Sequence, residues 1–243
     1  MDRKAEFIYE WVTDRLPVKG AAQLDVMRPS WRLGPWGGPL NGQKGRVEII
    51  RDLLLAFDFT EIFETGSYRG TTTEFLAVLS GLPVRSVEAV ERNFYFAQRR
   101  LAGVAGASVE LSDSRSFLRR HAQMAPTTPV FFYLDAHWEE DLPLVEELNI
   151  ISNSWENAVV VIDDFQVPDD VSYVFDDYGP GKRLTPELLD ASNVSSWPRL
   201  YPSMQGTDET GARSGCVVLC SPHLAGTLTR VSSLRSIPIT ESG

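Results

Sequence analysis

The chain has 243 residues and a formal net charge of −10, and these two properties exclude several classes of protein. A chain of this length can bury the core of one domain, so two large domains are not expected. The acidic balance argues against a nucleic-acid partner, because proteins that bind phosphate backbones usually present a basic surface. No apolar run in the sequence is long enough to span a bilayer. The sequence therefore predicts a cytoplasmic protein with no nucleic-acid or membrane partner.

The first 45 residues are predicted to form an N-terminal extension to a single domain at 46–243. Apolar residues at near-helical spacing favour a helix over 2–16. The segment 17–45 is rich in glycine and proline, which favours a wrapped loop or lid over regular structure. It contains Trp31 and Trp36, which are interpreted as packing residues, with substrate contact as the alternative.

Beyond this extension, apolar strands alternate with amphipathic helices. Near-continuous Val, Ile and Phe strands indicate a parallel sheet covered on both faces. We predict an α/β, doubly wound, Rossmann-like fold with a seven-stranded sheet, mostly parallel with an antiparallel C-terminal strand. The expected strands are 61–63, 84–90, 108–111, 129–135, 158–164, 199–203 and 215–221. The expected helices are 46–58, 71–80, 93–103 and 114–121, one capped by Asp141, and one that begins near Thr185.

The segment 60–74 reads TEIFETGSYRGTTTE and joins a short apolar strand to a helix through a glycine-rich turn. Glycines let the backbone approach a ligand closely, and a helix N-terminus offers free N–H groups, so the segment suits a nucleotide-like cofactor. Glu64, which precedes the glycines, would repel the pyrophosphate of a dinucleotide. The loop therefore favours a ligand with a positively charged group.

Acidic residues also follow the later strands. Ligands of open α/β sheets bind beyond the carboxyl ends of the strands, so an ordered series of acids along that edge indicates a site. A single acid there would usually cap a helix. The series comprises Glu64, Glu88, Asp113, Asp135 and the pair Asp163 and Asp164.

The glycine-rich segment resembles the first motif of the class I S-adenosylmethionine-dependent methyltransferases, which is an acidic residue followed by spaced glycines. Glu64, Gly66 and Gly70 match this motif, whereas Tyr68 replaces the usual middle glycine. The resemblance covers roughly residues 45–165. Within the family, the chain is most similar to the metal-dependent O-methyltransferase branch that includes the catechol and macrocin O-methyltransferases.

The resemblance implies which residues hold the cofactor. Glu88 would bind the ribose hydroxyls, because a carboxylate can accept two hydrogen bonds. Asp113 would lie beside the adenine amine and Asp135 near the methionine end, while Thr71 and Thr72 are either cofactor contacts or plain helix caps. The predicted cofactor-binding residues are Glu64, Gly66, Ser67, Tyr68, Gly70, Thr71, Thr72, Glu88, Ala89, Asp113, Ser114 and Asp135.

The resemblance also implies a divalent metal, with magnesium as the expected ion, held by Asp135, Asp163 and Asp164. Three carboxylates at neighbouring strand ends would repel one another unless a cation lies among them. The alternative is that Asp135 contacts the cofactor while the other two cap the following turn. His137, two residues after Asp135, is a candidate catalytic base, a further ligand, or a structural residue.

The sequence thus predicts methyl transfer from S-adenosylmethionine to an oxygen of a small-molecule acceptor, such as a sugar or another polyol. One alternative is a metal-dependent hydroxylase that uses Asp135 and His137 with iron, although three histidines in the chain are few for such a site. The other is a protein that binds the cofactor without turnover. Loops at 176–183 and 207–215 are candidate acceptor sites, and a homodimer is one option for the assembly.

Overall fold

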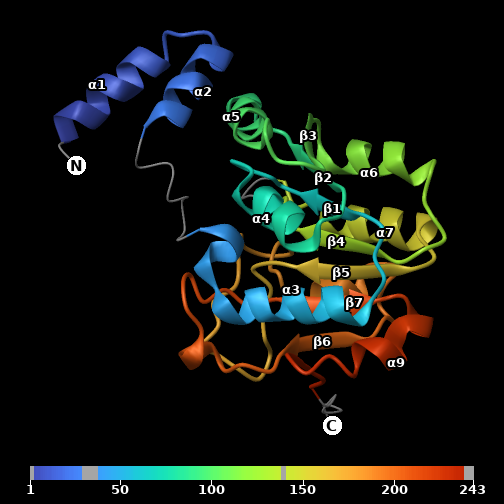
Figure 1. Ribbon diagram of the computed structural model, residues 1–243. Helices are drawn as coiled ribbons and strands as arrows, with labels where there is room; N and C mark the ends of the chain where they lie inside the picture. Colours follow the sequence, from blue (N-terminus) through green and yellow to red (C-terminus); the bar gives the residue numbers. More distant parts are fainter. Residues whose placement is uncertain (1–2, 29–37, 138–140, 238–243) are drawn as a thin grey trace.

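The computed structural model describes residues 3–28, 38–137 and 141–237, with the backbone alone for residues 3–7. Trp31 and Trp36 lie outside the described residues. The described chain consists of one central sheet with helices on both faces and a helical hairpin at the N-terminus (Figure 1). None of its helices has the length and apolar character needed to cross a membrane.

The eight strands of the sheet follow the order β3-β2-β1-β4-β5-β7-β6-β8. The first five pair in parallel, and β7 runs antiparallel to β5 and β6, so the predicted mostly parallel sheet with antiparallel C-terminal strands is confirmed. The additional strand is β8, whose two residues are too few to give a sequence pattern. The strands are β1 Ile62–Thr65, β2 Val84–Glu88, β3 Ala107–Leu111, β4 Val130–Leu134, β5 Ala158–Ile162, β6 Arg199–Pro202, β7 Val217–Cys220 and β8 Leu234–Arg235.

Most helices lie within about two residues of their predicted bounds. The α-helices are α1 Arg3–Thr13, α2 Val18–Met27, α3 Lys44–Ala56, α4 Thr71–Ser80, α5 Glu91–Leu101, α6 Ser114–Ala122, α7 Leu144–Ser154, α8 Pro186–Asp190 and α9 Ala225–Leu228. Three 3₁₀ turns complete the described set: η3 Pro39–Gly42, η4 Gly206–Asp208 and η5 Pro222–Leu224.

Two of the local predictions are wrong. The segment 17–45, predicted as irregular, contains α2, which includes the good helix formers Ala21 and Ala22. The glycines and prolines that follow them in the segment hide this helical pattern in the sequence. Asp141 does not cap α7, whose N-cap position is Pro143. Its carboxylate instead accepts two hydrogen bonds from Arg115, at 3.0 and 2.7 Å.

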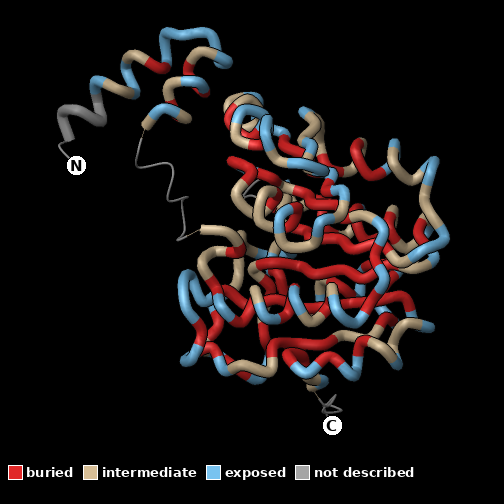
Figure 2. Tube along the Cα trace, in the orientation of Figure 1, coloured by how far each residue is buried: buried red, intermediate tan, exposed pale blue. Residues whose placement is uncertain are grey.

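The core lies on both faces of the sheet, and alternate residues of each central strand face opposite layers. Phe132 and Leu134 of β4 pack on the layer of α6, α7 and α8, whereas Phe131 and Tyr133 pack on the layer of α3, α4 and α9. Every residue of β4 and β5 is buried, as Figure 2 shows for the centre of the molecule. This burial on both sides explains why these strands are continuous apolar runs in the sequence.

The N-terminal hairpin joins the domain through α2, which packs beside α5 (Figure 1). The buried carboxylate of Asp25 on α2 accepts hydrogen bonds from Arg92 of α5, at 2.7 and 2.9 Å. It also accepts one from the Tyr9 hydroxyl of α1. Because α5 follows directly from β2, this contact places the hairpin close to the edge of the sheet where the predicted cofactor residues lie.

Candidate functional site

The loop between β1 and α4 has a backbone that requires glycine at one position. Gly66 has φ +82°, and a Cβ atom there would lie 2.2 Å from the carbonyl oxygen of Asp135. Gly70, also left-handed, occupies the N-cap position of α4. Tyr68 adopts a φ of +47°, a left-handed conformation that is costly for a residue with a Cβ atom. The loop therefore passes against the end of β4 with no space for larger residues at Gly66.

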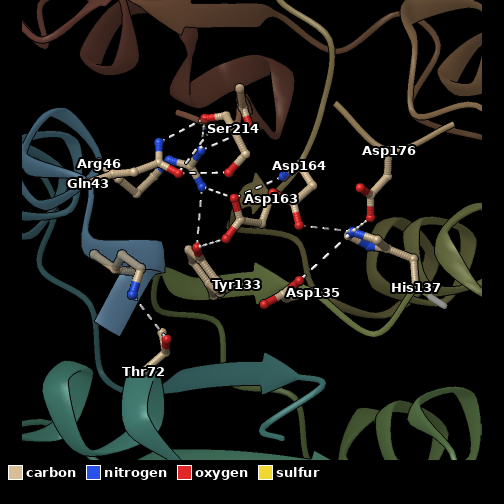
Figure 3. Close-up of polar contacts among 12 residues, drawn as sticks. Gln43, Arg46, Thr72, Tyr133, Asp135, His137, Asp163, Asp164, Asp176 and Ser214 are labelled. Atoms are coloured by element: carbon tan, nitrogen blue, oxygen red, sulfur yellow. Dashed lines mark hydrogen bonds and ion pairs between the residues drawn. The ribbon is translucent and has the colours of Figure 1, made fainter. Parts of the chain in front are cut away.

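Two hydroxyls of this loop are buried without a partner among the described residues, namely Ser67 Oγ and Thr71 Oγ1. A buried polar group without a hydrogen bond costs free energy, so a ligand that supplies one is favoured. Thr72 behaves differently, because its Oγ1 accepts a hydrogen bond from the Leu40 N–H at 3.2 Å (Figure 3). Thr72 thus links α4 to η3, whereas the hydroxyls of Ser67 and Thr71 could each form a hydrogen bond with a ligand.

Glu64 lies inside the sheet below the loop. Its carboxylate accepts hydrogen bonds from Thr73 and from Ser86, the latter at 2.5 Å. Burial raises the pKa of Glu64 to about 7, with a further contribution from Glu88 and in spite of these two hydrogen bonds. Glu64 thus links β1 to α4 and β2, and direct contact with a cofactor stays a prediction.

Substituting Glu64 by glutamine should flatten the pH dependence of stability. Because the pKa of Glu64 is raised on folding, the native state holds the proton between about pH 4.5 and 7, and the free energy of unfolding falls as pH rises through this window. This pKa shift corresponds to a fall of about 3 kcal/mol in the free energy of unfolding across the window. Urea unfolding across this range should show a shallower decline in Glu64→Gln than in the wild type.

The control for that measurement is Glu156→Gln, which changes an exposed carboxylate. This variant should keep the slope of the wild type. An unchanged slope in Glu64→Gln would contradict the role assigned to the buried carboxylate.

Glu88 ties the end of β2 to the glycine loop. Its two carboxylate oxygens accept hydrogen bonds from the Tyr68 N–H at 2.7 Å and the Val90 N–H at 2.8 Å. Burial raises its pKa above the usual value, although these backbone hydrogen bonds oppose the shift. Glu88 therefore lies beside the glycine loop, while ribose binding stays a prediction. The neighbouring Ala89 is exposed.

Asp113 and Ser114 lie at the end of β3, where α6 begins. Asp113 is the N-cap residue, and its Oδ1 accepts a hydrogen bond from the Ser116 N–H at 3.1 Å. Burial raises the pKa of Asp113, but this hydrogen bond and Arg115 lower it below the ordinary value overall. Ser114 is buried in the first turn. The capping function of Asp113 is thus present, and a contact with adenine stays a prediction.

An aspartate–histidine–aspartate group lies beyond β4 and β5. The ligand atoms of Asp135, His137 and Asp164 all lie within 4.8 Å of one another. His137 Nε2 is 3.8 Å from a carboxylate oxygen of each of the two aspartates, and 3.6 Å from Asp176 Oδ2 (Figure 3). The His137 side chain is only 3% exposed, and no described atom lies within hydrogen-bonding distance of Nε2. The Nε2 atom of His137 is therefore surrounded by three carboxylates, each farther away than a hydrogen bond.

The ionisable side chains of this group shift one another's pKa values. Burial and the nearby carboxylates of Asp163 and Asp164 raise the pKa of Asp135 well above its usual range. Burial lowers the pKa of His137, but Asp164 and Asp176 outweigh it and raise that pKa above the ordinary value. Burial raises the pKa of Asp164, but the interaction with His137 outweighs it and lowers that pKa below the ordinary value. The group therefore favours a positive charge at its centre.

Asp163 is placed apart from this group. Its carboxylate forms an ion pair with Arg46 of α3 and accepts a hydrogen bond from the Tyr133 hydroxyl. Asp163 Oδ1 also accepts a hydrogen bond from the Asp164 N–H at 2.8 Å. Of the three aspartates predicted to hold a metal, the structure brings Asp135 and Asp164 together and directs Asp163 toward Arg46 (Figure 3).

Asp176 was not singled out from the sequence, although its loop was named as a candidate acceptor site. Its N–H donates to the Asp164 carbonyl at 2.9 Å, which holds the loop against the end of β5. The Tyr178 hydroxyl donates to its carboxylate. No periodic pattern marks Asp176, so the pair of acids at 176 and 177 was the only available signal.

Comparison with known proteins gives matches at the level of structure alone, since no family model and no curated relative matches the chain. The O-methyltransferase from Bacillus cereus, solved with S-adenosylhomocysteine, matches 88% of this chain and 96% of its own, at 15% identity and a TM-score of 0.54. The O-methyltransferase TomG from Streptomyces achromogenes is involved in tomaymycin synthesis and was solved with S-adenosylmethionine. It also matches 88% of this chain and 96% of its own, at 19% identity and a TM-score of 0.50. The chain shares the fold of these O-methyltransferases.

Proposed function

We propose that the protein transfers a methyl group from S-adenosylmethionine to an oxygen of a small molecule, with the assistance of a divalent cation. The observation that carries the proposal is the meeting of two features at the carboxyl ends of β1, β4 and β5. One is the glycine loop with its buried, unpartnered hydroxyls, and the other is the Asp135, His137 and Asp164 group. Two solved structures with this fold contain S-adenosylmethionine or its demethylated product, which supports the choice of cofactor.

The residues around the glycine loop fit this cofactor. Ser67 and Thr71 would supply hydrogen bonds from their unpartnered hydroxyls, and Gly66 and Gly70 allow the backbone to approach closely. Glu88 would accept from the ribose hydroxyls in the role that the family resemblance implies. The sulfonium methyl is what the bound cofactor would supply. Methyl transfer needs mainly alignment of donor and acceptor, so the loop acts by holding the donor in place.

The Asp135, His137 and Asp164 group fits a divalent cation. Two carboxylates and a buried imidazole nitrogen without a hydrogen bond form a donor set that suits magnesium or, given the nitrogen, manganese. What a cation held there would supply is a lower pKa for an acceptor hydroxyl. Asp135 and Asp164 would balance its charge, and their fixed positions at adjacent strand ends would orient the acceptor.

The charge of the group also bears on the acceptor. Asp135, Asp164 and Asp176 together exceed the charge of one divalent cation, so a negatively charged acceptor would be repelled. A neutral polyol or a sugar that carries an amine fits better. This charge balance favours a small-molecule acceptor without carboxylate or phosphate groups near the reacting oxygen.

The histidines argue against the hydroxylase alternative, which needs two histidines and one carboxylate on iron. Only His137 lies in the group. His121 is 2.8 Å from Glu110, and His223 is 2.7 Å from Asn157. Since the chain has three histidines, a second histidine ligand is lacking.

Calorimetry with S-adenosylmethionine, with and without Mg²⁺ or Mn²⁺, tests the proposal. We expect cofactor binding in the wild type and its loss in Gly66→Ala, followed by methyl transfer to a panel of neutral polyols and phenols that depends on the cation. Absence of cofactor binding would refute the methyltransferase assignment. Binding without turnover on any acceptor would favour the protein that only binds the cofactor, and turnover in the presence of a chelator would remove the cation from the proposal.

A further inference from the structure

We infer that Asp163 is a positioning residue, held by Arg46, that fixes the Asp164 carboxylate in the candidate metal site and is not itself a ligand. The inference rests on the proposed function for the identity of that site. It departs from the sequence expectation that both acids after β5 bind the ion. Three observations carry it: the contacts of Arg46, the strand geometry of β5, and the backbone of Asp164.

The guanidinium of Arg46 is buried and hydrogen-bonded to four residues. Its side chain is 1% exposed, and its two terminal nitrogens donate to the carbonyls of Ser214 and Gly215, both at 2.9 Å, to the Tyr133 hydroxyl at 3.3 Å, and to Asp163. A buried guanidinium needs an opposite charge, and Asp163 supplies it. If the Asp163 carboxylate turned toward a cation, it would leave Arg46 buried without that charge.

The direction of Asp163 follows from the register of β5. Side chains alternate along a strand, so Asp163 continues the face of Val159 and Val161, which packs on the layer that contains α3. Arg46 belongs to α3, and Tyr133 faces the same layer from β4. Asp135 continues the same face from β4, where Tyr133 pairs with Val161, so the ion pair with Arg46 is what holds the Asp163 carboxylate out of the candidate metal group.

Asp164 reaches the group because its backbone leaves the strand conformation. Its φ is +50°, in the left-handed region that residues with a Cβ atom rarely adopt. Two hydrogen bonds hold this conformation: the Asp164 N–H donates to Asp163 Oδ1 at 2.8 Å, and the Asp164 carbonyl accepts from the Asp176 N–H at 2.9 Å. The oxygen of Asp163 that receives the first of them also receives Arg46. Arg46 therefore fixes Asp163, and Asp163 fixes Asp164.

Manganese binding measured by electron paramagnetic resonance tests this inference. Asp164→Asn should weaken Mn²⁺ binding at least about a hundredfold, as expected for loss of a ligand. Asp163→Asn should keep one Mn²⁺ per chain with an affinity lowered about tenfold, in the range typical of residues that orient ligands. The measurement is made on protein shown to be folded by circular dichroism.

A control variant separates positioning from simple loss of stability. Leu53→Ala removes a buried side chain from the same helix as Arg46 and should destabilise the protein without changing its Mn²⁺ affinity. A loss of Mn²⁺ in folded Asp163→Asn as complete as in Asp164→Asn would make Asp163 a ligand and overturn the inference. Unchanged affinity in Asp163→Asn would overturn it as well.

A second readout does not depend on the metal. In the metal-free protein at one fixed pH, the imidazole resonances of His137 should move in Asp163→Asn in the same direction as in Asp164→Asn, and stay in place in Leu53→Ala. With three histidines in the chain, they can be assigned through His121→Gln and His223→Gln. If the wild type binds no Mn²⁺, the cation in the proposed function fails while this readout still decides the positioning. Unmoved resonances in Asp163→Asn would refute it.

Discussion

Replacement of Asp164 by asparagine is expected to lower kcat for methyl transfer about a thousandfold at saturating cofactor. A bound cation stabilises developing charge by several kcal/mol, and each 1.36 kcal/mol corresponds to a factor of about ten in rate. Asparagine has nearly the same shape as aspartate and tolerates the left-handed backbone at this position, where φ is +50°. The fold should therefore persist while the charged ligand is lost.

The matched control is Asp177→Asn, an exposed residue of the loop that carries Asp176. Asp177 pairs with Arg183 at 2.9 Å and makes no contact with the candidate metal group. Both variants remove one negative charge from the same region. Metal affinity and kcat should fall in Asp164→Asn alone, and an equal effect in the two variants would point to the general field of the acidic loop in place of a ligand at Asp164.

Gly66→Ala is expected to remove cofactor binding and to lower the free energy of unfolding by about 2 to 5 kcal/mol. The left-handed backbone at φ +82° costs about 1 to 2 kcal/mol for a residue with a Cβ atom. The new methyl group would also meet the Asp135 carbonyl oxygen at 2.2 Å, so the loop or the end of β4 must move. Forced movement in a packed region costs a further 1 to 3 kcal/mol, roughly.

Gly81→Ala separates these two causes. Gly81 ends α4 with φ +68°, but a Cβ atom there meets no atom within 4 Å. This variant should lose only about 1 to 2 kcal/mol and bind the cofactor normally. Urea unfolding and calorimetry with S-adenosylmethionine would measure both effects. Equal losses in the two glycine variants would mean that the contact between the loop and β4 contributes nothing.

The parts of the fold that were predictable from sequence are those set by local patterns. The runs VFFYL in β4 and AVVVI in β5 are apolar because both faces of these strands are covered, and the spacing of glycines identified the loop before α4. The hairpin helix α2 was missed because its helix formers are diluted by the glycines and prolines that follow.

The candidate site was predictable only in part, because its geometry depends on distant residues. The doublet Asp163 and Asp164 was correctly located at the end of β5. Their separate roles depend on Arg46, which is 117 positions from Asp163 and has no sequence pattern that links the two. Asp176 reaches the site through a backbone contact with Asp164 from an irregular loop. Contacts of this kind come from tertiary packing, which strand and helix periodicities do not encode.

The hydrogen bonds of Arg46 also bear on the order in which the protein can acquire its structure during synthesis. Two of its acceptors, the carbonyls of Ser214 and Gly215, lie 168 and 169 positions further along the chain. Until the segment before β7 has emerged from the ribosome, this guanidinium lacks the groups that complete its burial. Contacts between such distant positions form slowly. The Asp135, His137 and Asp164 group should therefore reach its final geometry late in folding. Nascent chains that stop before β7 should be sensitive to proteases near α3.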